Sequence, residues 1–439
     1  MIREIFGDLE SDYPMNRLLQ GDVGSGKTIV ALSAMLLAAE NRLQSVLMVP
    51  TEILAEQHYI TVKYLLRSLP VNVGLLTGSV KGKDKEKFLK DCEEGRLDIA
   101  IGTHALLEKE VCFKKMALVV IDEQHRFGVK HRLDLTQRKP VPDVMVMTAT
   151  PIPRTLALGL YGDLDTSTID ELPPGRQGIG TLLKTETEAY RIIDEEIKKG
   201  RQAYIVCPLI EGSGSRKKRG GEDSELLPFS PEESGGTKLK SAVGEFQELK
   251  SETFKGVPIG LLHGRMGGKE KEKVMVGFQQ GRFSILVSTT VIEVGIDIPN
   301  ATVIAIQNAE RFGLSTLHQL RGRVGRGKEL SRCLLIAQPK TEEARRRLDF
   351  LLKSGNGFEL AEADLSLRGP GEIFGTSQHG LPDLKIADFG SDLELVVRSR
   401  KWAQDWLDSD PDLMKEENRP LKEHLRKHFS KIWHWANIA

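Results

Sequence analysis

The stretch GDVGSGKT, at residues 21–28, decides the fold of this chain. It fits the pattern G-x-x-x-x-G-K-[ST], and it lies between a short apolar segment at residues 17–20 and a helical run at residues 29–40. In this setting, glycines let backbone N–H groups converge on phosphate oxygens at the amino terminus of a helix. A chance match in a chain of this length is on the order of one or two per cent. We therefore interpret the stretch as a phosphate-binding loop.

The loop carries two side chains with separate tasks. Lys27 would bring a positive charge to the β and γ phosphates of a nucleoside triphosphate, and the Thr28 hydroxyl would ligate Mg²⁺. The residues predicted to hold the nucleotide are Gly21, Asp22, Val23, Gly24, Ser25, Gly26, Lys27 and Thr28.

Two carboxylates follow the apolar run at residues 118–121. The carboxyl ends of strands are where open α/β sheets present their ligands. Asp122 would hold Mg²⁺ through the water shell of the ion, and Glu123 would orient or deprotonate the attacking water. Such a pair more often marks a surface turn, but the phosphate-binding loop on an earlier strand favours the catalytic interpretation.

Apolar periodicity predicts the fold class. Short β-branched runs alternate with longer helix-period stretches as far as residue 340, which is α/β patterning with parallel sheets covered on both faces. The strands expected in the first half are residues 17–20, 45–49, 98–101, 117–121 and 144–147. Those expected in the second half are residues 202–207, 259–262, 284–288, 302–307 and 332–337. We predict two tandem sheets followed by a small, mostly helical unit.

Composition shifts predict the domain boundaries. The sequence LPPGR at residues 172–176 has turn chemistry, so we place one domain at residues 1–178 and a second at 179–340. Residues 212–241 are rich in Gly, Ser, Lys and Glu and carry few apolar side chains, which predicts a mobile surface insertion. The remaining 341–439 form the third unit.

The composition is that of an ordinary globular protein. The chain has 439 residues, 40% hydrophobic and 28% charged, which excludes a wholly disordered chain, collagen and coiled coil. Lys plus Arg and Asp plus Glu number 62 each, and this balance does not exclude nucleic acid, because local basic residues determine that affinity. No apolar stretch is long enough to cross a bilayer. The four cysteines are scattered, so we expect reduced thiols in a cytoplasmic protein.

Further motifs occur in a fixed order along the chain. Residues 122–125 read DEQH, a DExH box, and the chain resembles superfamily 2 helicases and translocases over nearly its whole length. The other matching stretches are PTEILAEQ at 50–57 (motif Ia), GTH at 102–104 (motif Ib), TAT at 148–150 (motif III), TTVIEVGID at 289–297 (motif V) and HQLRGRVGR at 318–326 (motif VI). In this superfamily two RecA-like P-loop domains flank one ATP, so the resemblance implies ATP and Mg²⁺ as cofactors.

A narrower resemblance is to the RecG family of bacterial ATP-dependent DNA helicases, which remodel stalled replication forks and branch-migrate recombination intermediates. The stretches that carry it are residues 21–31, 121–129, 148–155, 163–167 and 171–176. In addition, DLSLRGPGEIFG at residues 364–375 is similar to the translocation motif of that family, a hook that converts motor closure into steps along duplex DNA. The transcription-repair coupling factor shares several stretches, but Gln124 and residues 171–176 favour RecG.

The resemblance implies roles for individual residues. Arg323 and Arg326, three apart on an expected helix, would reach the γ-phosphate as arginine fingers. The predicted catalytic residues are Lys27, Asp122, Glu123, Arg323 and Arg326, with Gln319, Gly295 and Asp297 coupling ATP to DNA. The predicted DNA contacts are Thr51, Thr103, His104, Arg265, Thr289 and Arg368.

Family members carry a large amino-terminal region with an oligonucleotide-binding wedge, and the sequence from Met1 has no counterpart of it. We therefore expect a motor portion, with fork recognition and adenine selectivity unrepresented. The implied partners are forked or branched DNA and single-stranded DNA-binding protein, and the chain is expected to be a monomer that contacts no membrane. Two alternatives stay open: a transcription-repair coupling translocase, and a nucleotide-dependent clamp without productive unwinding.

Overall fold

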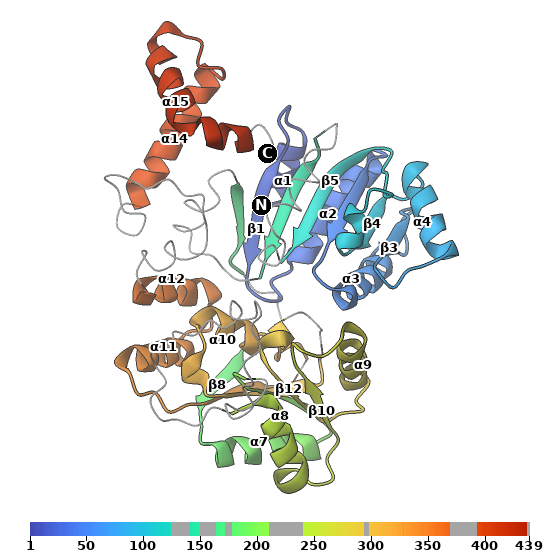
Figure 1. Cartoon of the computed structure of the whole chain (residues 1–439), viewed down its shortest axis with the longest axis vertical. Coiled ribbons are helices and arrows are strands. Elements are labelled where there is room, and N and C mark those ends of the chain that lie inside the picture. The colour runs from blue at the N-terminus through green and yellow to red at the C-terminus, as the bar shows by residue number, and fades with distance from the viewer. Residues whose placement is uncertain are drawn as a thin grey trace.

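Two parallel β-sheets, one in each half of the chain, form the framework of the molecule (Figure 1). The computed structural model describes residues 1–123, 141–149, 164–171, 178–209, 240–293, 298–327, 329–368 and 393–436. The first sheet has the order β3 (Val73–Leu76), β4 (Ile99–Gly102), β2 (Gln44–Met48), β5 (Met116–Asp122), β6 (Asp143–Thr148), β1 (Asn16–Gly21) and β7 (Asp165–Ile169).

Helices pack against this sheet and bury its central strands. They are α1 (Ile2–Leu9), α2 (Lys27–Glu40), α3 (Glu52–Leu65), α4 (Lys83–Glu93) and the short 3₁₀ helix η1 (His104–Leu107). Every residue of β2 and β4 is buried, as expected for parallel strands that are covered on both faces. The apolar core therefore holds the carboxyl ends of the central strands at one common edge.

The second sheet repeats the design. Its order is β10 (Ile259–Leu262), β11 (Ile285–Ser288), β9 (Gln202–Val206), β12 (Ala301–Gln307), β13 (Ser331–Ile336) and β8 (Ile179–Leu183). The helical elements around it are α7 (Glu186–Lys198), α8 (Ala242–Glu248), the π-helical turn η6 (Leu249–Thr253), α9 (Gly268–Gln279), η7 (Thr290–Glu293), η8 (Ala309–Arg311) and α10 (Leu314–Arg321).

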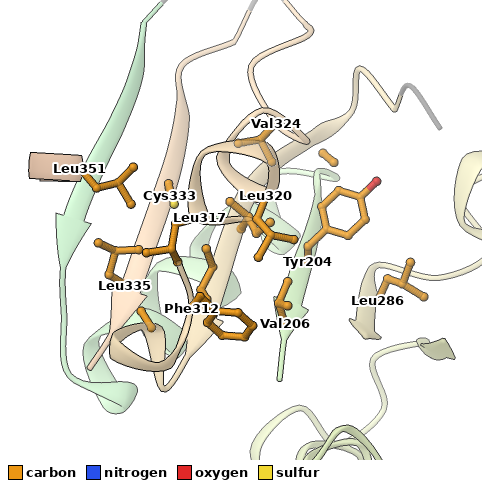
Figure 2. Close-up of a cluster of buried hydrophobic side chains, with 14 of the residues drawn as sticks. Tyr204, Val206, Leu286, Phe312, Leu317, Leu320, Val324, Cys333, Leu335 and Leu351 are labelled. Atoms are coloured by element: carbon orange, nitrogen blue, oxygen red, sulfur yellow. The ribbon is translucent and has the colours of Figure 1, made fainter. Parts of the chain in front are cut away.

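Helix α10 is anchored in the core of the second sheet. Its Leu317 and Leu320 are fully buried and join a cluster with Tyr204 and Val206 of β9 and Cys333 of β13 (Figure 2). Because α10 packs into this core, the residues that follow the helix have a fixed position relative to the second sheet.

The chain ends in helices. They are α11 (Glu342–Lys353), α12 (Gly357–Arg368), α14 (Leu393–Ser409), η9 (Glu416–Asn418) and α15 (Arg419–Ala436). Leu351 of α11 and Leu360 of α12 belong to the same apolar cluster as α10, so this helical pair is packed onto the second sheet. Among the described helices, none combines the length and the apolarity that a bilayer crossing requires.

The predicted α/β class is confirmed, and each expected strand is present to within one residue at either end. Three strands were missed: β3, β7 and β8. Each lies at an edge of its sheet and carries exposed or half-buried residues, so it lacks the continuous apolar run by which buried strands are recognised.

The chain passes from the first sheet to the second between Ile169 and Ile179, and the boundary at 178 stays a prediction. The predicted insertion lies almost entirely outside the described residues. The segments on either side of the insertion pair with each other, because Leu209 and Ser241 form an isolated β-bridge.

A buried arginine ties the first helix to the sheet, and its loss should be measurable. Arg17 of β1 is 8% exposed, and its guanidinium donates to Asp8 Oδ2 at 2.5 Å and to Ser167 Oγ at 2.8 Å. We expect Arg17→Ala to lower the free energy of unfolding by about 2 kcal/mol, between the values for exposed and for buried pairs. Denaturant unfolding checks this, with Arg96→Ala as the control.

Arg96 is a suitable control because it pairs with Asp91 on the surface, where its side chain is 52% exposed. We expect that substitution to change the stability by less than about 1 kcal/mol. Equal losses in the two variants would show that the Arg17 network does not stabilise the first unit, by which we mean the first sheet with its helices. The second unit is the second sheet with its helices.

Candidate functional site

The glycine-rich loop turns sharply between β1 and α2. Gly24 and Gly26 have φ angles of +74° and +96°, in the left-handed region that glycine adopts without steric penalty. A Cβ atom at Gly21 would lie 2.6 Å from Ser25 Oγ and 3.0 Å from the Cβ of Ile169. The loop therefore depends on glycine at position 21, where it approaches the Ser25 hydroxyl and Ile169 of β7 closely.

The polar groups of the loop suit a phosphate ligand. The Lys27 ammonium is buried and donates to the carbonyls of Gly21 and Asp22, at 2.9 Å each. Ser25 Oγ is buried too and has no hydrogen-bond partner among the described residues. A buried ammonium, a hydroxyl without a hydrogen-bond partner among the described residues and the N–H groups at the amino terminus of α2 are together suited to bind a phosphate group.

The two acidic residues lie at the same edge of the sheet as this loop. β5 and β1 both pair with β6 and run parallel to it. Asp122 and Gly21 are the last residues of β5 and β1, so they lie at the same edge of the sheet, two strands apart. Asp122 Oδ2 is 3.3 Å from Nε2 of His58, on α3.

Glu123 has an unusual backbone. Its φ is +56°, and its N–H donates to the carbonyl of Met147 at 3.0 Å. For a residue with a side chain this conformation costs roughly 1–2 kcal/mol. Strain of this kind is concentrated at functional sites.

Helix α10 and the turn after it meet the glycine-rich loop. A Cβ atom at Gly322 would lie 3.0 Å from the side chain of Val23, and His318 Nε2 lies 2.6 Å from Asp22 Oδ1. Figure 1 shows α10 on the side of the second unit nearest β1. The structure thus brings motif VI, in the second unit, against the loop of the first unit.

The arginines predicted to act on the nucleotide belong to this contact region, but the expectation that they share a helix is wrong, because α10 ends at Arg321 and both arginines follow its end. Arg323 directly follows Gly322 and is 5% exposed, and Gln319 is buried. Arg326 is partly buried, and its Nε donates to the carbonyl of Gly322 at 3.3 Å.

The predicted DNA contacts follow the ends of strands. In the first unit, Thr51 caps α3, since its side chain accepts a hydrogen bond from Leu54 N at 3.4 Å. Thr103 is buried, and its hydroxyl has no hydrogen-bond partner among the described residues. His104, next in the chain, is exposed at the start of η1.

In the second unit, Arg265 is exposed just after β10. Thr289 is buried just after β11, and its N–H donates to the carbonyl of Leu262 at 3.3 Å. The backbones of the two predicted contacts are therefore close to each other at one end of this sheet.

Some predicted positions cannot be placed. Gly295, Asp297 and Gln124 lie outside the described residues, as does residue range 369–375 of the translocation motif. Arg368 is the last residue of α12, and its side chain is outside the described part of the structure.

Two histidines at the site were not among the predicted residues. His58 contacts Asp122. No local sequence pattern predicts this contact, because it depends on how α3 packs beside β5. His318 opens the motif VI stretch and is three residues before Arg321, so helical spacing would have placed these two on one face.

The α3 helix carries a glutamate whose ionisation is opposed by acidic residues of both units. Ile53 of α3 packs against the core of the second sheet. The pKa of Glu56, on the same helix, lies above its ordinary value, because of burial first and then repulsion by Glu272 of α9 and by Glu52. Ionised Glu56 therefore opposes this packing.

The sign of the resulting pH dependence follows from the raised pKa. The contribution of Glu56 to stability is present below the pKa of its unfolded state and is lost as the pH rises through the higher folded-state pKa. We expect Glu56→Gln to raise the unfolding midpoint by about 1–2 °C at pH 7.5 and to have no effect near pH 4. Thermal melts at both pH values check this.

Glu93→Gln, at an exposed position that ends α4, is the matched control and should leave the midpoint unchanged at both pH values. A gain at pH 7.5 that persists at pH 4 would assign the effect to packing and not to charge.

Three family models match the chain in succession. Residues 6–158 match the DEAD/DEAH box helicase model, and residues 188–328 match the helicase conserved C-terminal domain. Residues 354–439 match the model described as ATP-dependent DNA helicase RecG, domain 3, C-terminal.

Curated relatives match nearly the whole chain. It is 47% identical to the ATP-dependent DNA helicase RecG of Synechocystis over 435 residues, which are 98% of this chain and 50% of that protein. It is 46% identical to the RecG helicase of Bacillus subtilis over 97% of this chain and 60% of that one. The chain thus spans half to three fifths of the length of these relatives.

Solved structures agree with these matches. A structure of RecG bound to a three-way DNA junction has a TM-score of 0.72 and 45% identity, over 90% of this chain and 49% of that one. S. cerevisiae Dbp5 bound to RNA and ADP BeF3 has a TM-score of 0.54 and 16% identity, over 91% of this chain and 92% of that one, and this likeness concerns the fold alone.

Proposed function

We propose that this chain, which belongs to the RecG family of ATP-dependent DNA helicases, hydrolyses ATP between its two sheets and uses the energy to move on branched DNA. The observation that carries the proposal is the contact between the glycine-rich loop and the motif VI region, through Asp22 with His318 and Val23 with Gly322. A nucleotide on that loop would touch both units, as an ATP-driven motor requires.

The proposed division of labour follows the sheets. Residues 1–178 would form the RecA-like ATP-binding domain and residues 179–340 the RecA-like C-terminal helicase domain. Residues 341–439 would carry the translocation motif and the helical extension that follows it.

The loop would bind the phosphates with groups that already face its interior. Lys27 would exchange its bonds to the carbonyls of Gly21 and Asp22 for phosphate oxygens, and Ser25 Oγ would gain a partner. Thr28 and Asp122 would hold Mg²⁺, which when bound neutralises phosphate charge; one or two protein ligands suffice for this ion beside phosphates and water.

Water activation and charge stabilisation would come from opposite units. Glu123 would orient the attacking water and accept its proton, and Arg323 and Arg326 would donate to γ-phosphate oxygens from the second unit. Because both units contribute, ATP would favour one relative arrangement of the sheets and hydrolysis would release it.

The proposed partner is branched DNA, in keeping with the relative solved on a three-way junction. Thr51, Thr103 and His104 would contact its backbone from the first unit and Arg265 and Thr289 from the second, since such side chains bind phosphates without reading bases. We further propose that Arg368 couples the translocation motif to DNA. In this proposal the chain acts as a cytoplasmic monomer and meets single-stranded DNA-binding protein at forks.

Steady-state ATP hydrolysis, measured without DNA, with linear duplex and with a three-way junction, tests the function. We expect DNA to stimulate hydrolysis and the junction to do so most. A folded sample that hydrolyses ATP at one rate under all three conditions would contradict the helicase proposal.

The same assay tests one of the two alternatives. A transcription-repair translocase would show no preference for the junction over linear duplex, and in a separate pull-down it would capture RNA polymerase. The relatives named RecG and the match at residues 354–439 favour neither of them.

A further inference from the structure

His58 occupies the side of α3 that faces the first sheet. Leu54, four residues before it, and Val62, four residues after it, are both buried. Residues four apart lie on one face of a helix, and the face turned to a core is normally apolar. The His58 side chain is 14% exposed, so its ring is mostly withdrawn from water. A polar group in such a place is expected to have a polar partner.

Asp122 meets this face of α3 from the sheet. Side chains alternate between the two faces of a strand, so Asp122 shares its face with Leu118 and Val120 of β5. Both of these residues belong to the apolar cluster that also contains Leu54 and Val62. One core therefore fixes the position of α3 relative to β5.

The contact between the two polar side chains has a defined direction. His58 Nε2 lies 3.3 Å from Asp122 Oδ2, and the Asp122 side chain is 17% exposed. An ionised carboxylate has only acceptors, so Nε2 would carry the proton and donate it. Hydrogen bonds at active sites are often long without ligand and shorten in the complex. A donor held at Oδ2 limits the rotation of the carboxylate and so sets the direction of Oδ1.

The same face of the sheet carries the helix that follows the glycine-rich loop. Val30 and Ala31 of α2 belong to the cluster that contains Val120, and Thr28 lies in the first turn of this helix. Asp122 therefore points to the face that α2 covers, where the proposed function places Mg²⁺. Carboxylates that serve a metal ion are themselves oriented by hydrogen-bond donors, and loss of such a donor lowers metal affinity about 10–100-fold.

We propose that His58 is a positioning residue that donates to Asp122 and holds its carboxylate in the direction that Mg²⁺ on a bound nucleotide requires. The inference rests on the proposed function for the statements that the loop binds a nucleotide with Mg²⁺ and that Asp122 serves the ion. It adds a role for α3, which so far contributed only a predicted DNA contact at its amino terminus.

Three variants separate the donor from the packing of the ring. The amide nitrogen of His58→Gln reaches about as far as Nε2 and can donate to Asp122. The side chain of His58→Asn is one methylene shorter and does not reach it, and His58→Leu fills the space without any donor. His424→Leu, at an exposed position on α15, is the control, and Asp122→Asn shows the effect of losing the carboxylate itself.

The test is the affinity for a fluorescent, non-hydrolysable ATP analogue, titrated once with Mg²⁺ and once with EDTA. By linkage, the gain in affinity on adding Mg²⁺ equals the factor by which the protein-bound analogue holds the ion more tightly than the free analogue. We expect His58→Leu and His58→Asn to reduce this gain about tenfold, the lower end for a lost donor of this kind. His58→Gln and the control should keep the gain, and all five variants should bind the analogue equally in EDTA.

Two results would overturn the role of His58 and leave Mg²⁺ on Asp122: a full gain in His58→Leu and His58→Asn while Asp122→Asn loses it, or a loss in His58→Gln as large as in His58→Leu. If His58→Leu does not fold, His58→Asn decides the question. A full gain in Asp122→Asn would overturn this inference together with the metal assignment. The expected gains in a protein that DNA does not stimulate would contradict the helicase function and leave this inference intact.

Discussion

Replacing Glu123 with glutamine is expected to lower the steady-state rate of ATP hydrolysis about a thousandfold, within the range for the loss of a general base. Glutamine has nearly the same size and can still bind water, but it cannot accept the proton of the attacking water. The residue follows β5 at the edge of the sheet that also carries the glycine-rich loop, with its backbone held by Met147. ATP affinity should change little, because the expected ligands of the phosphates lie in the loop.

Glu108→Gln is the matched control. This carboxylate pairs with Lys85 on the surface, so its loss should leave hydrolysis unchanged. A Glu123→Gln protein that binds ATP and hydrolyses it at the wild-type rate would remove the catalytic role of Glu123. It would also favour the nucleotide-dependent clamp among the alternatives that the sequence left open.

Replacing Arg323 with alanine is expected to lower the rate of hydrolysis by about a thousandfold or more, if it has the proposed role of an arginine finger. Arg323 is buried next to Gly322, whose backbone contacts Val23 of the glycine-rich loop. A guanidinium there would stabilise charge that develops on the γ-phosphate, and it acts mainly in the transition state. We therefore expect kcat to fall far more than the affinity for ATP.

Arg323→Lys tests the geometry behind this expectation. Lysine keeps the charge but loses the planar pair of donors, so it should recover only a small part of the rate. Arg282→Ala, at an exposed position of the same unit, should hydrolyse ATP normally. If Arg323→Ala loses ATP affinity and rate in equal measure, Arg323 serves ground-state binding or the fold and is not an arginine finger.

The strands show how much of the fold a local sequence pattern can predict. The apolar run at residues 118–121 predicted β5, because a strand buried on both faces is apolar at every position. β7 has the sequence DTSTI and β8 has IGTLL, with several exposed or half-buried positions. These edge strands exist through pairing with β1 and β13, and no pattern in their own residues specifies such a partner.

The candidate site likewise has features that a local sequence pattern predicts and contacts that it does not. Its loop and its acidic pair were recognisable because each depends on consecutive residues: N–H groups in a row in one case, the end of a single strand in the other. The roles assigned to them stay predictions. The contacts of His58 with Asp122 and of Gly322 with Val23 join segments that lie far apart along the chain. The family resemblance implied that motif VI would lie near the loop, but neither residue pair was predicted.

By itself, the sequence determined the α/β class, the tandem sheets and the family, because periodicity and contiguous motifs are properties of neighbouring residues. Only the tertiary structure decided that Asp22 meets His318, 296 residues away, and that Arg321 extends this contact to the turn after α11. The reason is physical: a hydrogen bond between two units depends on the packing of both cores, and no short stretch of sequence encodes that packing.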